Sequence, residues 1–236
     1  MISMSVAILA GGLATRLRPI TVTIPKSLVT VAGKPFLAHQ LEYLRSQGVS
    51  RVVLCVGYLG EMIREQFGNG RGLGIEIEYS FDGAVLLGTG GAIKQALPIL
   101  GESFFVMYGD SYLPVDFQDV LQGFYQAGKP ALMTVFPNFG KWEVSNVWFE
   151  DGTIRKYSKR EHLPEMQYVD YGLSVFRASA FQGIEAGIAY DLADLMSSLS
   201  EENQLAGYVA PERFFEIGSL SGLDELNSYL SRGGVS

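Results

Sequence analysis

Two glycines and two cations near the start of the chain have the types and spacing needed to hold a phosphate chain. Gly11 and Gly12 directly follow an apolar run at residues 6–10, and Arg16 and Lys26 come shortly after them. Glycines that follow a buried strand allow positive φ angles and leave main-chain N–H groups open to an anion. The pattern predicts a polyphosphate-binding loop; the alternative is an ordinary strand-to-helix turn with surface arginines.

A carboxylate follows a second buried strand. Residues 103–108 form the apolar run SFFVMY, and Asp110 comes directly after Gly109 at its carboxyl end. Oxygen ligands suit Mg²⁺, so we predict that Asp110 binds a divalent ion. The alternative for an aspartate in this setting is a helix cap or an Asx-turn.

The segment LLGTGGAIKQAL at residues 86–97 predicts a helix whose first turn faces a ligand. Thr89 is of a type that caps helices. Gly90 and Gly91 are expected to expose the amides of the first turn, where anions bind readily. The alternative is a tight helix start with a structural role only.

The elements that must position these residues alternate along the chain. Apolar strands near residues 6–10, 51–57 and 103–108 are separated by segments of helical periodicity, which indicates right-handed crossovers and a mostly parallel sheet. Ligands of such sheets bind beyond the carboxyl ends of the strands, where each of the three motifs falls. Further along, Asp151-Gly152 predicts a β-hairpin turn. We therefore expect an α/β fold: a Rossmann-like, mostly parallel sheet flanked by helices, with a small β-hairpin lobe.

Composition limits the possible functions. The chain has 236 residues, of which 47% are hydrophobic and 18% charged, values typical of a globular domain. A net charge of −7 argues against a nucleic-acid binder. The single cysteine, Cys55, excludes an internal disulfide and is expected to be a packed core thiol. With no signal-peptide pattern and no apolar stretch approaching ~18 residues, we expect a cytoplasmic protein without a membrane partner.

The motifs together resemble one enzyme family. LAGGLATRLRPIT followed by PK, then LGTGGA and GD, is similar to the signatures of the sugar-1-phosphate nucleotidyltransferases, the nucleoside-diphosphate-sugar pyrophosphorylases. The resemblance runs from about residue 5 to about residue 230. It implies a GT-A-like nucleotidyltransferase fold in a single domain, residues 1–236. The nucleotide-binding part would cover about residues 1–136 and the sugar-phosphate-binding part about residues 137–236.

The same resemblance implies roles for individual residues. The catalytic residues would be Arg16, Lys26 and Asp110. The metal ligands of Mg²⁺ would be Asp110 and Glu216, the latter standing where the family has an aspartate. The residues that would bind the nucleotide are Leu9, Ala10, Gly11, Gly12, Thr15, Arg16, Gly88, Thr89 and Gly90. The residues that would bind the sugar phosphate are Gly109, Asn146, Lys159, Asp170, Tyr171 and Gly172.

Four departures from the family pattern bear on specificity. Ala14 replaces a loop glycine, and Ser158 replaces the glutamate that usually precedes Lys159. Val85 and Leu86 stand where an acidic or amide residue and a proline are usual. Because a valine side chain has no hydrogen-bonding group, Val85 cannot recognise a base edge.

The implied reaction is transfer of a nucleotidyl group from a nucleoside triphosphate to a sugar 1-phosphate, with release of pyrophosphate. The chain looks most like the D-glycero-D-manno-heptose 1-phosphate guanylyltransferases, or a mannose 1-phosphate enzyme, with GTP. A uridylyltransferase acting on N-acetylmuramate 1-phosphate or a hexose 1-phosphate is the alternative. A non-catalytic sugar-nucleotide-binding relative and a glycosyltransferase stay open, although a glycosyltransferase normally shows D-x-D where this chain has Gly109-Asp110-Ser111. The resemblance also implies a homodimer.

Overall fold

The computed structural model describes residues 2–12, 20–142 and 144–232. Its centre is a nine-stranded sheet in the order β5-β4-β1-β6-β11-β8-β12-β10-β9. In chain order these strands are β1 (Ser5–Leu9), β4 (Arg51–Val56), β5 (Glu76–Phe81), β6 (Ser103–Tyr108), β8 (Ala131–Pro137), β9 (Val147–Glu150), β10 (Thr153–Tyr157), β11 (Tyr168–Arg177) and β12 (Leu205–Val209).

Two small ribbons and the helices complete the described chain. The ribbons pair β2 (Thr30–Val31) with β3 (Lys34–Pro35), and β7 (Ser111–Tyr112) with β13 (Phe215–Glu216). The α-helices are α1 (Phe36–Ser46), α2 (Gly60–Phe67), α3 (Gly88–Leu100), α4 (Phe117–Ala127), α5 (Leu192–Glu201) and α6 (Leu220–Ser231). The 3₁₀ turns are η2 (Ile20–Val22), η3 (Lys26–Leu28), η4 (Arg71–Leu73) and η5 (Ala178–Phe181).

The sheet is mostly parallel, as the sequence predicts. The four strands β5, β4, β1 and β6 pair in parallel, so their carboxyl ends lie along one edge. Strand β11 then pairs antiparallel with both β6 and β8, and β12 restores the parallel direction beside β8. Seven of the nine strands in the described sheet therefore run the same way, and the exceptions are β10 and β11.

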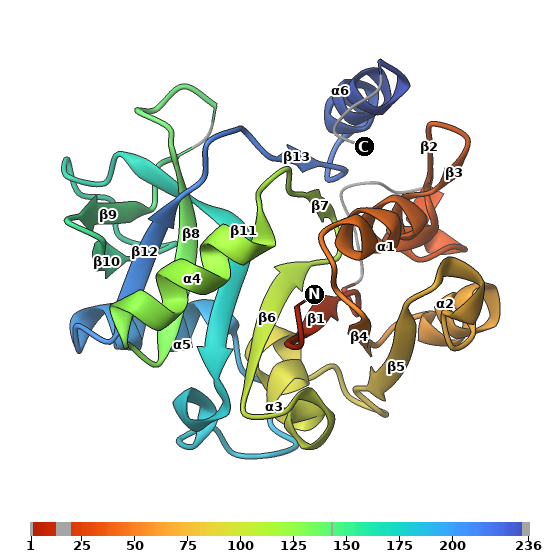
Figure 1. Cartoon of the computed structure of the whole chain (residues 1–236), viewed down its shortest axis with the longest axis horizontal. Helices are drawn as coiled ribbons and strands as arrows, with labels where there is room; N and C mark the ends of the chain where they lie inside the picture. The colour runs from red at the N-terminus through yellow and green to blue at the C-terminus, as the bar shows by residue number, and fades with distance from the viewer. Residues whose placement is uncertain (1, 13–19, 143, 233–236) are drawn as a thin grey trace.

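Helices cover both faces of the sheet, giving the three layers of an α/β fold (Figure 1). One core contains the apolar faces of α1 and α4, through residues such as Leu41 and Phe124. The other core contains α3 and α5, through residues such as Ile93 and Met196. Strand β1 has Val6, Ala7 and Ile8 fully buried, which confirms the prediction of a buried strand; Val6 and Ile8 face one core and Ala7 the other.

The predicted hairpin is also present. Strands β9 and β10 pair antiparallel at the edge of the sheet and turn at Asp151 and Gly152. These two residues have φ angles of +48° and +74°, as a primed turn requires. Because β11 inserts between β6 and β8, the two halves of the chain share one sheet. The division into a nucleotide part and a sugar part stays a prediction.

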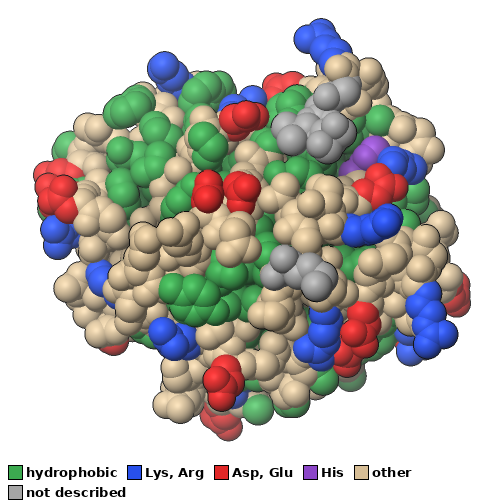
Figure 2. All heavy atoms as spheres, in the orientation of Figure 1, with side chains coloured by type: hydrophobic (Ala, Val, Ile, Leu, Met, Phe, Trp, Pro, Cys, Tyr) green, Lys and Arg blue, Asp and Glu red, His purple; other side chains and the backbone are tan. Residues whose placement is uncertain are grey.

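No helix among the described residues combines the length and the apolar character needed to cross a bilayer. On the face drawn in Figure 2, described Lys and Arg side chains are scattered among acidic ones.

Gly172 marks an irregularity in β11 that matters for the functional edge. The register of β11 against β8 shifts between Asp170 and Ser174, and Gly172 has a φ of +96°. Its N–H donates to the Asp170 Oδ1 at 2.9 Å. The kink therefore fixes the direction of the Asp170 carboxylate, and only glycine adopts this conformation without strain.

We expect Gly172→Ala to lower the free energy of unfolding by about 1–3 kcal/mol, the usual cost of a strained backbone position. Urea unfolding measures the change. Gly72→Ala is the matched control, because Gly72 has no positive φ and a Cβ there would meet nothing within 4 Å. Equal stability of the two variants would contradict a strained site at Gly172.

Candidate active site

A cavity of about 400 Å³ opens at the carboxyl ends of β5, β4, β1 and β6. This is the sheet edge at which the sequence motifs were expected to meet. The cavity is lined by six of the residues predicted to bind the nucleotide: Leu9, Ala10, Gly11, Gly12, Gly88 and Thr89. The predicted catalytic residues Lys26 and Asp110 and the predicted sugar-phosphate residue Gly109 also line it.

Other predicted residues lie elsewhere or beyond the described chain. Thr15 and Arg16 are outside the described residues, so their roles stay predictions. Gly90 is buried inside the first turn of α3. Except for Gly109, the residues predicted to bind the sugar phosphate do not line the cavity. They lie beside the cavity, on β11 and on the loops that precede β11 in the chain.

The strongest polar contact in the cavity joins two predicted catalytic residues. Lys26 Nζ donates to Asp110 Oδ2 at 2.6 Å, with the two side chains 15% and 31% exposed. Lys26 begins η3, so the ion pair joins this turn to the residue that follows β6. A close, partly buried ion pair of this kind gives fixed charges in a site with restricted access to water.

The strand ends meet closely at Asp110. The Gly109 N–H donates to the Leu9 carbonyl at 2.9 Å. A Cβ at position 109 would lie 2.7 Å from that same carbonyl oxygen. Any larger residue than glycine would therefore separate β6 from β1, and with it Asp110 from the glycine loop.

The other predicted metal ligand, Glu216, does not line the cavity, but its strand lies beside Asp110. Glu216 pairs across the β7–β13 ribbon with Ser111, and the N–H of Ile217 donates to the Asp110 carbonyl at 2.9 Å. Within the described ranges, no group of three or more His, Cys, Asp or Glu residues is arranged to hold a metal ion. Magnesium is commonly bound by one or two carboxylates together with substrate phosphates, so Asp110 and Glu216 fit that ion.

The start of α3 differs from its expected form. The amides of Gly90 and Gly91 do not face a ligand but donate to the Tyr190 carbonyl at 2.8 and 3.1 Å. Thr89 does not cap α3: its hydroxyl donates to Asp191 Oδ1 at 2.9 Å and accepts from the N–H of Leu192 at 2.8 Å. Thr89 thus accepts a hydrogen bond from an N–H group in the first turn of α5. The start of α3 differs from the expected form because it contacts the segment before α5, a long-range contact that the local sequence of a helix does not reveal.

Sequence reasoning missed Asp82. This residue follows β5 and lines the cavity, and its Oδ2 accepts from the N–H of Leu87 at 3.1 Å. Burial raises the pKa of its carboxyl, although that hydrogen bond lowers it. Val85, where the family has its polar base contact, is 67% exposed instead. The rule that identified Asp110, a carboxylate after a buried strand, also describes Asp82.

Cys55 forms part of the cavity floor and is fully buried. Burial raises the pKa of its thiol to about 12, so the thiolate is not formed at neutral pH. The expectation of an unreactive core thiol is confirmed.

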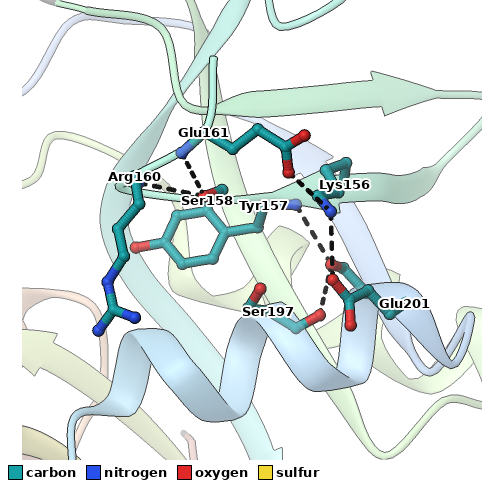
Figure 3. Close-up of polar contacts among 8 residues, drawn as sticks. Lys156, Tyr157, Ser158, Arg160, Glu161, Ser197 and Glu201 are labelled. Carbon is teal, nitrogen blue, oxygen red and sulfur yellow. Dashed lines mark hydrogen bonds and ion pairs between the residues drawn. The ribbon is translucent and has the colours of Figure 1, made fainter. Parts of the chain in front are cut away.

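The predicted sugar-phosphate residues gather beside the cavity. Lys159 is exposed and lowers the pKa of both Asp170 and Asp191, so it lies near both carboxylates. The Ser158 hydroxyl accepts from the N–H groups of Arg160 and Glu161 at 3.1 and 2.8 Å, which forms the turn that carries Lys159 (Figure 3). Serine thus has a structural role at this position.

Asn146 and Tyr171 have structural partners as well. The Asn146 Oδ1 accepts from the N–H of Asp170 at 3.0 Å. The Tyr171 ring lies in the core on the α1 and α4 face, packed edge-on against Phe214 with centroids 5.5 Å apart. The structure therefore corrects the expectation for Tyr171: its side chain points away from the face that carries Asp170.

Comparison with known proteins adds to this geometry. Residues 5–231 match the family described as nucleotidyl transferase. The chain is 32% identical over 228 residues to the N-acetylmuramate alpha-1-phosphate uridylyltransferase of Neisseria meningitidis serogroup B, covering 94% of this chain and 96% of that one. It is 43% identical over 113 residues to the D-glycero-alpha-D-manno-heptose 1-phosphate guanylyltransferase of Campylobacter jejuni, covering 48% and 50%.

Among solved structures, that of HddC from Yersinia pseudotuberculosis superposes with a TM-score of 0.81 at 22% identity, covering 96% of this chain and 99% of that one. This likeness supports the α/β fold.

The environment of Asp170 predicts a pH effect on stability. Burial raises the pKa of its carboxyl above the ordinary 3.8, against the opposing effects of the Gly172 N–H, Lys159 and Tyr157. A raised pKa in the folded state means that stability present at low pH is lost as the pH rises through that pKa. Asp170→Asn keeps an oxygen that accepts the hydrogen bond from the Gly172 N–H. Because the amide does not ionise, the variant does not lose stability as the pH rises.

We therefore expect Asp170→Asn to be more stable than the parent protein at pH 7, with the difference vanishing near pH 4. Thermal unfolding across this pH range measures it. Asp224→Asn, at an exposed position on α6, is the control and should follow the parent throughout. A constant difference between Asp170→Asn and the parent at all pH values would refute the assignment.

Proposed function

Because the chain belongs to the nucleotidyl transferase family, we propose that it transfers a nucleotidyl group from a nucleoside triphosphate to a sugar 1-phosphate. The observation that carries this proposal is the 2.6 Å pair of Lys26 and Asp110 beside the glycine loop in one cavity. A fixed cation and glycine amides suit a polyphosphate, and a carboxylate beside them suits the cation that accompanies it. Both curated relatives named above act, by their names, on sugar 1-phosphates.

The proposed reaction needs little from the protein beyond positioning and charge. A phosphate oxygen of the sugar 1-phosphate attacks the α-phosphorus of the triphosphate in line, and pyrophosphate leaves. Two anions must approach each other, so the main barrier is electrostatic. Lys26 neutralises charge on the reacting phosphates, and the amides of Gly11 and Gly12 hold the chain in place. Arg16 would add a second cation.

A magnesium ion held by Asp110 and Glu216 would supply further neutralisation of phosphate charge. This assignment is supported by the backbone, which places β13 beside Asp110: Glu216 pairs with Ser111, and the N–H of Ile217 donates to the Asp110 carbonyl at 2.9 Å.

Asp82 favours a guanine nucleotide. A carboxylate accepts hydrogen bonds only, and guanine presents two adjacent donor groups, N1–H and the 2-amino group, on one edge. Uracil presents a single N–H between two carbonyl oxygens, which a carboxylate repels. We therefore propose GTP as the nucleotide and D-glycero-D-manno-heptose 1-phosphate or mannose 1-phosphate as the sugar. The alternative is a uridylyltransferase acting on N-acetylmuramate 1-phosphate or a hexose 1-phosphate.

We expect Lys26→Ala and Asp110→Ala each to reduce pyrophosphate release by about 10²–10³-fold, the usual cost of one preorganised electrostatic contact. The assay combines magnesium, each of four nucleoside triphosphates and a panel of sugar 1-phosphates. Circular dichroism checks that the variants are folded.

Lys129→Ala is the matched control, because Lys129 contacts Thr153 and Asn203 away from the cavity. Near-parental turnover of either cavity variant would rule out the proposed site. Binding of nucleotide by the parent protein without turnover of any sugar 1-phosphate would instead favour the non-catalytic relative.

Asp82→Asn tests the nucleotide. It should lower kcat/KM for GTP by at least about tenfold, because hydrogen bonds to a charged group are worth about 1.5–3 kcal/mol, and should leave UTP unchanged or improved. Glu76→Gln, an exposed change near the other end of the same strand, should alter neither. A parent protein that prefers UTP, with no effect of Asp82→Asn, would exclude guanine recognition by Asp82.

A further inference from the structure

The turn that carries Asp110 is held by the side chain of a buried glutamine on α1. This residue, Gln40, is only 1% exposed. Its Nε2 donates to the carbonyl of Tyr108 at 3.1 Å and to the carbonyl of Ser111 at 2.8 Å. Because Tyr108 ends β6 and Ser111 begins β7, one amide group joins the two strands that lie on either side of Asp110.

The chemistry of this contact requires a side-chain amide. Both partners are carbonyl oxygens, which only accept hydrogen bonds, and the NH₂ group of a glutamine carries two hydrogens on one atom. A glutamate at position 40 would place oxygen against oxygen, and an apolar side chain would leave two carbonyls without this donor. The Gln40 Oε1 has no partner among the described residues. The NH₂ group is therefore the part of the side chain that the fold uses.

A second side chain on the same face of α1 supports the main chain further along. Tyr43 lies three residues after Gln40, and its hydroxyl donates to the Val115 carbonyl at 3.1 Å. Residues three apart on a helix are neighbours on its surface, so α1 runs along residues 108–115, beside β7 in Figure 1. This segment has little regular structure, since β7 is two residues long, and its main-chain groups must find partners elsewhere.

The position of Gln40 distinguishes it from Tyr43. The two carbonyls that Gln40 binds flank Asp110, and the Asp110 carbonyl itself accepts from the N–H of Ile217 at 2.9 Å. The Asp110 carboxylate lines the cavity and pairs with Lys26. Gln40 is not among the described residues that line the cavity. Any effect of Gln40 on chemistry must therefore pass through Asp110.

We propose that Gln40 is a positioning residue that holds the Asp110 carboxylate in place for the reaction. By fixing the main chain on both sides of Asp110, it keeps that carboxylate beside Lys26. Its effect on rate rests on the proposed function, because a displacement of about 1 Å near the reacting atoms can cost about 10²-fold in rate.

Gln40→Met tests this role, because methionine has a similar length but no donor. We expect kcat for pyrophosphate release to fall about 10–100-fold, as for a misplaced reacting group. KM for the nucleoside triphosphate should stay within about twofold of the parent, because a loss confined to kcat marks an interaction made in the transition state. Gln40→Asn is a milder second variant: it keeps the amide but is one methylene shorter, and its kcat should lie between those of Gln40→Met and the parent.

Tyr43→Phe is the matched control. It removes one buried hydrogen bond from α1 to the same stretch of main chain, at Val115 instead of beside Asp110. Thermal unfolding should show a lower unfolding temperature for both Tyr43→Phe and Gln40→Met, since each leaves a carbonyl without its donor. Only Gln40→Met should lose kcat. Equal losses of kcat in the two variants, or a parental kcat in Gln40→Met, would overturn the proposal.

A double variant tests whether Gln40 acts through Asp110. In the Asp110→Ala background, Gln40→Met should change the remaining kcat by less than about twofold, because two residues that act as one unit are not additive. A further loss as large as the loss in the parent background would mean that Gln40 acts independently of Asp110. That result would contradict the assignment.

Hydrogen exchange provides a readout that does not depend on turnover. The amide of Ile217, which donates to the Asp110 carbonyl, should exchange at least about tenfold faster in Gln40→Met, as local opening near Asp110 becomes easier. In Tyr43→Phe it should exchange as in the parent. Unchanged exchange in Gln40→Met would overturn the positioning role whether or not the protein turns over. A parent protein that releases no pyrophosphate with any sugar 1-phosphate, but shows the faster exchange in Gln40→Met, would remove the proposed function and leave the positioning of Asp110 supported.

Discussion

The ion pair between Lys26 and Asp110 joins two parts of the chain that are far apart in sequence and brings both to the edge of the sheet. It holds the turn after the glycine loop against the end of β6. The hydrogen bond from the Gly109 N–H to the Leu9 carbonyl keeps the carboxyl ends of β6 and β1 side by side next to this ion pair. The ion pair and the backbone hydrogen bond therefore act at neighbouring residues, and the cavity lies around them.

The sheet order explains how a single edge can bring together so many different groups. Parallel neighbours end side by side, so residues that follow β5, β1 and β6 become adjacent although long helices separate them in sequence. The antiparallel β11 contributes residues near its amino end, and the Gly172 N–H donates to the Asp170 carboxylate there. Each group is therefore positioned by the strand that it follows or belongs to.

Features that depend on local sequence were predictable. Asp110 after its strand, the hairpin at Asp151 and the buried Cys55 follow from short-range patterns. Features that depend on distant partners were not predictable. The α3 amides donate to Tyr190, about a hundred residues away in sequence, and no local pattern in a helix start reveals such a partner. Asp82 is a different case: it follows β5 as Asp110 follows β6, so the strand-end rule describes it, but that its side chain lines the cavity depends on how the sheet is assembled.

The Tyr190 carbonyl at the start of α3 has a consequence for the direction in which a nucleotide enters. A helix start with open amides would offer phosphates a second binding position in the cavity, besides the glycine loop. Because the Gly90 and Gly91 amides donate to the Tyr190 carbonyl instead, the start of α3 and the glycine loop differ in the groups that they offer. A nucleotide, which carries its phosphates at one end and its flat base at the other, then has one favourable orientation in the cavity.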